Sequence, residues 1–573
     1  MRYVALACDY DGTLAKDGRV DDSTVEALRR LANSGRRLIL VSGRLLEDLL
    51  EVFPQAMMFD RIVAENGALL YHPATHEEKV LGERPPDAFI EALRARDVDP
   101  LGAGRSIVAT REPHQSTAVE VIRDLGLEWH VIFNKGAVMI LPSSVNKSTG
   151  LLAALGSLEI SPHNVVGVGD AENDHALLST CECGVAVANA LPMLKERADM
   201  VTRGDHGAGV VEVIERILAS DLRELDGQLA RRHAILLGAE DSGHEVLLPS
   251  QRVCVLLAGP SGSGKSTMTL GIIERLEEQD YQFCLVDPEG DYESIQSAIV
   301  LGEAEHPPDT WEILRAVQRP DEEVVINLLG VPLTDRPDFF INLLPRLTEI
   351  RTRMGRPHWI VVDEAHHLLP QSGSPAASTL SQMKEGLLLV TVHPDRLARE
   401  ALALVDVVIA LGEAPAPEQT LRIVSEALGK PLPAGERPSS QGGEASIWFA
   451  RMDEPPKRLH IAPARTERRR HIRKYAAGEL GEDKSFYFRG PEGKLNLRAQ
   501  NLSVFLQMAD GVDDETWTYH LRRHDYSRWF REAIKDDDLA KEAVSIESDV
   551  EASPAESRKR MREAIEKRYT HPA

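Results

Sequence analysis

Two aspartates stand directly after an apolar run near the start of the chain, in Asp9-Tyr10-Asp11-Gly12. The run from Tyr3 to Cys8 predicts a buried strand, and the carboxyl ends of parallel strands face the ligand crevice of a sheet. Gly12 allows the chain to turn there, so that both carboxylates reach one point. Two carboxylates this close suit a hard divalent cation such as Mg²⁺, which takes oxygen ligands. For this segment taken alone, a simple loop turn is the alternative.

Three further segments strengthen the prediction of a phosphate site. The strand from Leu38 to Val41 leads into Ser42-Gly43, whose hydroxyl can donate a hydrogen bond to a phosphoryl oxygen. Lys147 stands just before a helical stripe, where it can neutralise a phosphate as a point charge. A later strand, Val165 to Val168, leads into Gly169-Asp170 and then Asn173-Asp174, which adds two carboxylates.

These four motifs closely resemble those of the haloacid dehalogenase (HAD) superfamily of phosphohydrolases. The segments Ile62–Ala68 and Gly184–Ala190 also resemble the branch that carries a cap between the second and third motifs (subfamily IIB, Cof type). The short cap is similar to that of phosphoglycolate and sucrose-phosphate phosphatases. The resemblance implies a Mg²⁺-dependent phosphatase that hydrolyses a small phosphorylated metabolite through an aspartyl-phosphate.

The same resemblance implies a role for each matching residue. Asp9 is the nucleophile, and Asp11 is the general acid/base that protonates the leaving oxygen and then activates water. Asp170 completes the Mg²⁺ site with Asp9 and the carbonyl of Asp11. The residues that bind phosphoryl oxygens, orient Lys147 or metal-bound water, or contact the substrate are Ser42 with Lys147, Asp174, and Gly43 with Asn173. In the cap, Asn134-Lys135 interrupts an apolar stretch and is the candidate for specificity, with an exposed solvated pair as the alternative.

A second phosphate-binding motif follows the strand Arg252 to Ala258 and precedes a helical stripe, as G-x-x-x-x-G-K-[ST] requires. Its glycines let backbone N–H groups wrap phosphates. Lys265 then reaches the β and γ phosphates, and Ser266 holds Mg²⁺. No N-K-x-D element follows, so ATP is favoured over GTP. The nucleotide-binding residues of this loop are Gly259, Gly262, Gly264, Lys265, Ser266 and Thr267.

The apolar strand from Trp359 to Val362 ends in Asp363-Glu364, a Walker B element. Asp363 is expected to bind Mg²⁺ through water. Glu364 is placed to activate water, which favours hydrolysis over small-molecule kinase chemistry. His393, at the tip of a later strand, is the candidate γ-phosphate sensor, with an ordinary loop histidine as the alternative.

Together with Cys284–Tyr292, these elements resemble the HerA/FtsK-like ATPases, which often form rings. The resemblance makes a homo-oligomer one expected assembly. His393 stands where glutamine is usual, and no N-terminal barrel is evident.

Composition limits the remaining possibilities. The 573 residues, 43% hydrophobic and 27% charged, indicate several globular domains. No run of about 18 apolar residues occurs, and the N-terminus lacks a signal-peptide pattern, so we expect no membrane partner and a cytoplasmic location. Five cysteines make no disulfide framework. A net charge of −24 disfavours broad nucleic-acid binding. The basic run 465–474 leaves a local contact open, although a solvated linker is its first interpretation.

Alternating strand and helix patterns predict an α/β fold. We expect a Rossmann-like phosphatase core with an inserted α+β cap, then a P-loop α/β domain and a small, mainly helical C-terminal domain. The expected boundaries are 1–81 and 144–218 for the core, 82–143 for the cap, 219–242 for a helical connector, 243–463 for the P-loop domain, 464–484 for a basic linker and 485–573 for the C-terminal domain.

Three hypotheses about function follow. The first is a Mg²⁺-dependent phosphatase coupled to an ATP-binding and ATP-hydrolysing domain. The second is a ring-forming motor associated with DNA or defence, with an accessory phosphatase; the net charge counts against it. The third is a bifunctional kinase/phosphatase, and Glu364 counts against that one.

Overall fold

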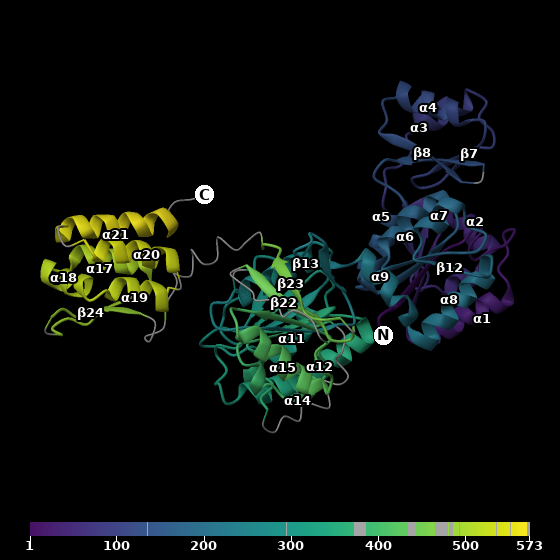
Figure 1. Ribbon diagram of the computed structural model, residues 1–573. Helices are drawn as coiled ribbons and strands as arrows, with labels where there is room; N and C mark the ends of the chain where they lie inside the picture. The colour runs from purple at the N-terminus through teal and green to yellow at the C-terminus, as the bar shows by residue number, and fades with distance from the viewer. Residues whose placement is uncertain are drawn as a thin grey trace.

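The computed structural model (Figure 1) places the described residues in four β-sheets with their helices. It describes residues 1–134, 136–293, 295–371, 386–433, 443–452, 454–464, 480, 485–491, 493–534, 536–549 and 552–569. The basic run 465–474 and Lys135 therefore lie outside the described residues. Among the described helices, none is both long enough and apolar enough to cross a bilayer.

The first sheet has eight strands in the order β12-β11-β10-β1-β2-β3-β4-β5, and all but the last two pair in parallel. Its central strands are apolar and wholly buried, because helices cover both faces. The strands are β1 (Ala5–Asp9), β2 (Arg37–Val41), β3 (Arg61–Ala64), β4 (Leu69–His72), β5 (Glu77–Val80), β10 (Val165–Gly169), β11 (Cys183–Ala186) and β12 (Met200–Val201). The helices are α1 (Asp22–Asn33), α2 (Leu46–Val52), α5 (Lys147–Leu158), α6 (His175–Thr180), α7 (Pro192–Arg197), α8 (His206–Ser220) and α9 (Asp226–Arg232).

A separate four-stranded antiparallel sheet, with two helices on one face, projects from this core (Figure 1). Its apolar side chains form their own cluster between the sheet and the helices. The elements are β6 (Gly102–Ala103), β7 (Val108–Arg111), β8 (Trp129–Asn134), β9 (Ala137–Pro142), α3 (Asp87–Arg94) and α4 (Gln115–Asp124). We call this unit the cap.

The second large sheet has eleven strands in the order β14-β13-β23-β22-β21-β15-β20-β19-β16-β18-β17. From β21 to β17 all strands run parallel, and an antiparallel set of four completes one edge. The strands are β13 (Ile235–Ala239), β14 (Glu245–Leu248), β15 (Cys254–Ala258), β16 (Phe283–Asp287), β17 (Ala298–Leu301), β18 (Glu323–Asn327), β19 (Trp359–Val362), β20 (Leu387–Thr391), β21 (Val407–Leu411), β22 (Glu444–Phe449) and β23 (Lys457–Ile461). The helices are α10 (Lys265–Glu277), α11 (Thr310–Val317), α12 (Arg336–Met354), α14 (Arg399–Leu402) and α15 (Ala416–Leu428).

One sequence expectation fails between the two sheets. The segment 219–242 is helical only as far as Arg232, and Ile235–Ala239 forms strand β13, which pairs with β14 and β23. Five mostly apolar residues fit a strand as well as a helix, and the sheet edge supplied by β23 decides in favour of the strand.

The two large sheets are joined through the residues that precede their parallel strands. Glu182, just before β11, accepts hydrogen bonds at one oxygen from Arg2 (2.6 Å) and Gln251 (3.0 Å), and at the other from Tyr281 (2.9 Å). His163 Nδ1 lies 2.7 Å from the Glu182 carboxylate, and the His163 ring stacks on Tyr281 at 3.8 Å. The joint therefore occupies the amino-terminal edge of both sheets, around one fully buried carboxylate.

The C-terminal residues pack five helices against a short hairpin around an aromatic core. Phe486, Phe505, Trp517 and Tyr526 lie at its centre. The described residues of this domain are therefore mainly helical, as the sequence predicts. The elements are β24 (Phe486–Phe488), β25 (Leu497–Ala499), α17 (Leu502–Gly511), α18 (Asp514–Arg522), α19 (Asp525–Glu532), α20 (Asp537–Glu547) and α21 (Pro554–Tyr569).

Candidate functional site

Lys147 lies between two carboxylates at the carboxyl end of the first sheet. Its Nζ is 2.5 Å from both Asp9 Oδ1 and Asp174 Oδ1, and all three side chains are almost completely buried. Asp9 is the last residue of β1, and Lys147 is the first residue of α5. Asn146 caps that helix by accepting a hydrogen bond from the Thr149 N–H, which fixes the start of α5 at Lys147.

The loop after β10 is built around Asp174. Its second oxygen accepts hydrogen bonds from the backbone N–H groups of Asp170 and Ala171, each at 2.9 Å. The Thr13 hydroxyl donates to Asp170 Oδ1 at 3.0 Å, which ties this loop to the turn after β1. Asp174 thus both shapes the loop and orients Lys147.

These buried charges act on one another. Burial and the nearby Asp174 raise the pKa of Asp9, while Lys147 opposes them. Burial alone would lower the pKa of Lys147, but the Asp174 and Asp9 carboxylates outweigh it and raise that pKa. Oxygen atoms of Asp9, Asp170 and Asp174 lie within 4.8 Å of one another. This all-oxygen donor set fits Mg²⁺.

Asp11 forms a bidentate ion pair with a residue that sequence reasoning did not select. Arg44 donates from Nε and Nη2 to the two Asp11 oxygens, both at 2.7 Å. Arg44 follows Ser42-Gly43 directly, and Ser42 Oγ accepts its backbone N–H at 3.1 Å. The signal in the sequence was an arginine next to a phosphate-binding hydroxyl.

A second missed residue holds the cap. Glu65 is fully buried, and its carboxylate accepts three backbone N–H groups at the start of the cap sheet, from Arg105 (2.9 Å), Ser106 (2.9 Å) and Ile107 (3.3 Å). Glu65 and Asn66 both have a positive φ, which non-glycine residues rarely adopt. The strained turn after β3 therefore fixes the cap to the core.

The cap closes over the substrate-contact residues. A side chain at Gly43 would approach Met139 Sδ on β9 to 3.2 Å, and Asn173 Nδ2 donates to Asn66 Oδ1 at 3.0 Å. Met139 belongs to an apolar cluster that joins the cap to the core. Of the predicted specificity pair, Lys135 lies outside the described residues, and only the backbone of Asn134, at the end of β8, is described.

A second candidate site lies on the other large sheet, around the loop between β15 and α10. Gly262 and Gly264 have φ values of 79° and 94°, a conformation in which glycine carries no strain. Gly259, also predicted to line the phosphates, packs closely against Ser263 and Leu411. Lys265 Nζ donates to the carbonyls of Gly259 and Pro260, each at 3.0 Å, and burial lowers the pKa of this lysine. Ser266 and Thr267 follow it in the first turn of α10.

The carboxylates of Asp363 and Glu364 lie near this loop and act on Lys265. Burial and then Glu364 raise the pKa of Asp363, and burial also raises the pKa of Glu364 although Lys265 opposes it. Glu364 has a φ of 41°, and its buried Oε2 makes no hydrogen bond among the described residues but lies 3.3 Å from His366 Nδ1. Two neighbouring buried carboxylates, Asp363 and Glu364, fit a hydrated Mg²⁺.

The predicted sensor His393 lies near the end of β20, where its backbone N–H donates to Thr391 Oγ1 at 3.0 Å. Its ring packs edge-on against His366 at 5.2 Å, and its side chain is 42% exposed. The fully buried hydroxyl of Thr391 contacts His366 Nδ1 at 3.1 Å, so Thr391 is a further polar group at this strand tip that the sequence did not single out.

Known proteins match the region that holds the first site. The profile of the haloacid dehalogenase-like hydrolases matches residues 6–99 and 107–214. A phosphoglycolate phosphatase from Methanothermobacter thermautotrophicus is 33% identical over 223 residues, which span 37% of this chain and 98% of that protein. The chain belongs to the haloacid dehalogenase-like hydrolase family.

Further similar proteins cover the same part of this hydrolase. Phosphoglycolate phosphatase 2 from Saccharolobus solfataricus is 29% identical over 229 residues, which span 39% of this chain and 96% of that protein. Among solved structures, a haloacid dehalogenase-like hydrolase from Bacteroides thetaiotaomicron is 21% identical, with a TM-score of 0.34, covering 38% of this chain and 99% of that one. The part of this hydrolase that the family profile matches holds the Asp9, Lys147 and Asp174 cluster at its strand ends.

Proposed function

We propose that the N-terminal region hydrolyses a small phosphorylated acid of the phosphoglycolate kind through an aspartyl-phosphate on Asp9. The observation that carries this proposal is the buried Lys147 between Asp9 and Asp174, because a fixed cation beside the nucleophile stabilises the charge of a transferring phosphoryl group. The curated names of the relatives support the substrate class.

The chemistry follows from the positions of this chain's residues. An Asp9 oxygen attacks phosphorus, the bond to the substrate oxygen breaks, and Asp11 gives that oxygen a proton. Asp11 then takes a proton from the water that splits the aspartyl-phosphate. Ser42 and Lys147 bind the phosphoryl oxygens. Mg²⁺, held by Asp9, Asp170 and the Asp11 carbonyl, would supply further neutralisation of the phosphoryl charge.

Arg44 is the positioning residue for Asp11. Two hydrogen bonds from Arg44 fix the orientation of that carboxylate. The closeness of Met139 to Gly43 supports a small substrate, because the cap leaves limited room above Ser42-Gly43.

The test is phosphate release with Mg²⁺ from 2-phosphoglycolate, sugar phosphates and mononucleotides. We expect 2-phosphoglycolate to give the highest kcat/KM, and Asp9→Asn to reduce kcat by about a thousandfold or more. The exposed Asp21, which makes no capping hydrogen bond, supplies the matched control Asp21→Asn, expected to keep full activity. Absence of turnover with every substrate would refute the proposal.

We also propose that residues 243–463 bind and hydrolyse ATP, as in HerA/FtsK-like ATPases. The raised pKa of the buried Glu364 supports this, since a carboxylate that activates water has to accept a proton. Lys265 supports it as well, because its present partners are two loop carbonyls that a phosphate can replace. Asp363, Ser266 and Thr267 would hold Mg²⁺ and phosphate oxygens, and His393 would contact the γ-phosphate.

Calorimetric titration with Mg·ATP and measurement of phosphate release test the two steps separately. Lys265→Ala is expected to lose ATP binding, whereas Glu364→Gln should bind ATP and fail to hydrolyse it. Unchanged binding in Lys265→Ala would remove the loop assignment. Stimulation of hydrolysis by DNA would instead favour the motor hypothesis.

The joint between the sheets argues against a shared kinase/phosphatase site. It contains residues that precede strands, whereas both candidate sites lie where strands end. A phosphorylated intermediate cannot pass directly between sites on edges that face away from the joint. We therefore infer two separate reactions in one chain.

A further inference from the structure

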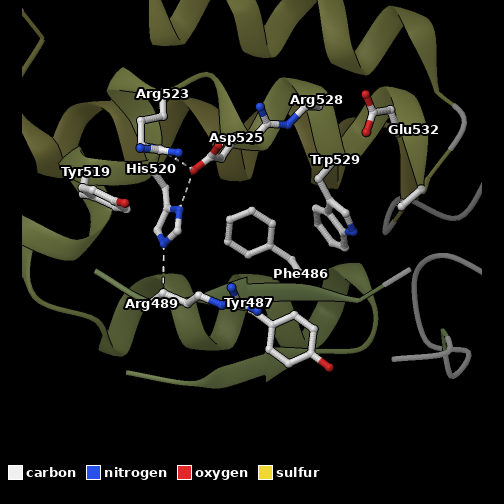
Figure 2. Close-up of a pocket in the computed structure, with 11 residues that line it drawn as sticks. Phe486, Tyr487, Arg489, Tyr519, His520, Arg523, Asp525, Arg528, Trp529 and Glu532 are labelled. Atoms are coloured by element: carbon white, nitrogen blue, oxygen red, sulfur yellow. Dashed lines mark hydrogen bonds and ion pairs between the residues drawn. The ribbon is translucent and has the colours of Figure 1, made fainter. Parts of the chain in front are cut away.

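The C-terminal domain contains a pocket that neither proposed reaction uses. It has a volume of about 440 Å³ and lies between the end of β24 and the helices α18 and α19. This volume falls within the range of small-molecule sites. Figure 2 shows the aromatic and charged side chains that surround it.

The floor of the pocket is aromatic. Phe486 and Trp529 are 6% and 7% exposed, and their ring centroids lie 5.3 Å apart. The half-buried rings of Tyr487 and Tyr519 stand at the sides. Flat aromatic surfaces at the base of an open pocket favour a ligand with a planar ring, since stacking contributes about 1–3 kcal/mol for each nucleic-acid base.

The rim is rich in guanidinium groups. Arg523 and Arg528 both pair with Asp525, whose side chain is only 11% exposed while theirs are more than half exposed. Asp525 therefore anchors the two arginines from below and leaves N–H groups of each facing the opening. Arg489 lies 5.5 Å over the Tyr487 ring and has no carboxylate partner among the described residues.

A buried histidine holds the floor and the rim together. His520 Nε2 accepts the backbone N–H of Arg489 at 3.0 Å, so its Nδ1 carries the proton and donates to Asp525 at 2.8 Å (Figure 2). The neutral ring connects the strand end that bears Arg489 with the start of α19. The arginines are thus presented by a preorganised frame.

We propose that this pocket binds a single mononucleotide, with the base on the aromatic floor and the phosphate on Arg489, Arg523 and Arg528. Bidentate arginine contacts suit phosphate oxygens, and a planar base suits the rings below. Three arginines against Asp525 and Glu532 leave a local charge of only +1. This balance suits one phosphate group and is too small for a polynucleotide backbone, which needs several phosphate contacts.

The experiment titrates the full chain carrying Lys265→Ala with AMP, so that the P-loop makes no contribution. We expect one AMP site in this background, and at least a tenfold loss of affinity when Arg489→Ala and Arg523→Ala are added. Arg522→Ala removes an exposed arginine at the end of α18 that does not line the pocket, and it should leave the affinity for AMP unchanged. Because all three arginines are exposed, none of these changes threatens the aromatic core.

Further ligands separate the sources of the binding energy. Ribose 5-phosphate lacks the base and adenosine lacks the phosphate, so each is expected to bind at least tenfold more weakly than AMP. Tyr519→Phe should keep AMP affinity and Tyr519→Ala should lower it. An affinity for AMP that stays the same when Arg489→Ala and Arg523→Ala are introduced would overturn the proposal. So would oligo(dT) affinity that rises with length and falls steeply with salt, because that marks a polynucleotide surface.

Discussion

The two candidate phosphate sites of this chain differ in the partners of their lysines. In the phosphatase, Lys147 already lies between Asp9 and Asp174 and offsets part of the charge of the Asp9, Asp170 and Asp174 cluster. In the P-loop site, Lys265 bonds to carbonyls while Asp363 and Glu364 face each other with raised pKa values. In the first site a cation is therefore in place between two carboxylates before substrate arrives, whereas in the proposed second site Mg·ATP would have to bring the positive charge.

The largest expected effect separates the two lysines by stability. Lys147→Met leaves two buried carboxylates without a cation, so we expect it to lower the free energy of unfolding by about 3–5 kcal/mol. Lys265→Met breaks only two hydrogen bonds to carbonyls and should cost about 1 kcal/mol. Denaturant unfolding of both variants measures the difference. Equal losses in the free energy of unfolding would mean that the two lysines contribute alike to stability.

The next prediction concerns the joint, which lies away from both sites. Burial alone would raise the pKa of Glu182, but His163 and Arg2 hold it well below its usual range. Glu182→Gln removes the buried negative partner of Arg2, which keeps only Asp226 among the described residues, and should cost about 3 kcal/mol at neutral pH.

The same carboxylate sets a pH dependence. Because its folded pKa is depressed, its contribution is complete above the unfolded value of about 4.3 and is lost as pH falls below that value. Unfolding measured from pH 3 to 6 should show this acid loss in the natural chain and not in Glu182→Gln. The variant should keep kcat at both sites at neutral pH. A selective loss of one activity in Glu182→Gln would indicate that the structure of the joint affects catalysis at that site.

Ligand binding gives the third prediction. Mg·ATP at a hundred times its dissociation constant should stabilise the chain by about 2.7 kcal/mol. The Lys265→Met variant should show little of this stabilisation. Thermal unfolding with and without Mg·ATP measures it, and an undiminished shift in the variant would show that the nucleotide binds elsewhere.

The smallest effect concerns Arg44. Without its two hydrogen bonds Asp11 loses a fixed orientation, so Arg44→Gln should lower kcat/KM by about tenfold. Arg44→Lys should recover only part of the loss, because an ammonium keeps the positive charge but cannot form the bidentate pair. Arg37→Gln breaks an exposed ion pair with Asp60 next to the same sheet and serves as the control. Full kcat/KM in Arg44→Gln would remove Arg44 from the mechanism.

Strands and strand-end residues were the predictable part of this molecule. The apolar runs that predicted β1, β2, β10, β15 and β19 match the strands within a residue or two, because central parallel strands are buried on both faces. Their direction then brings Asp9 and Asp174 to one edge of the sheet without any knowledge of the loops.

Contacts between loops were not predictable. The Arg44–Asp11 pair and the hold of Glu65 on the cap depend on how turns from different strands approach each other. The joint around Glu182 combines residues of two domains, and nothing in either segment indicates its partner. Hairpin β13–β14 was missed because its first strand follows a helix without a glycine or proline to mark the change.

The joint at the amino-terminal edges has an evolutionary consequence. The loops that determine substrate choice leave the opposite edges, so insertions and substitutions there do not disturb the contact between the two domains. Substitutions at one candidate site can therefore be selected without altering the other. The buried contacts of Glu182 hold the two domains together whatever changes occur at the opposite edges.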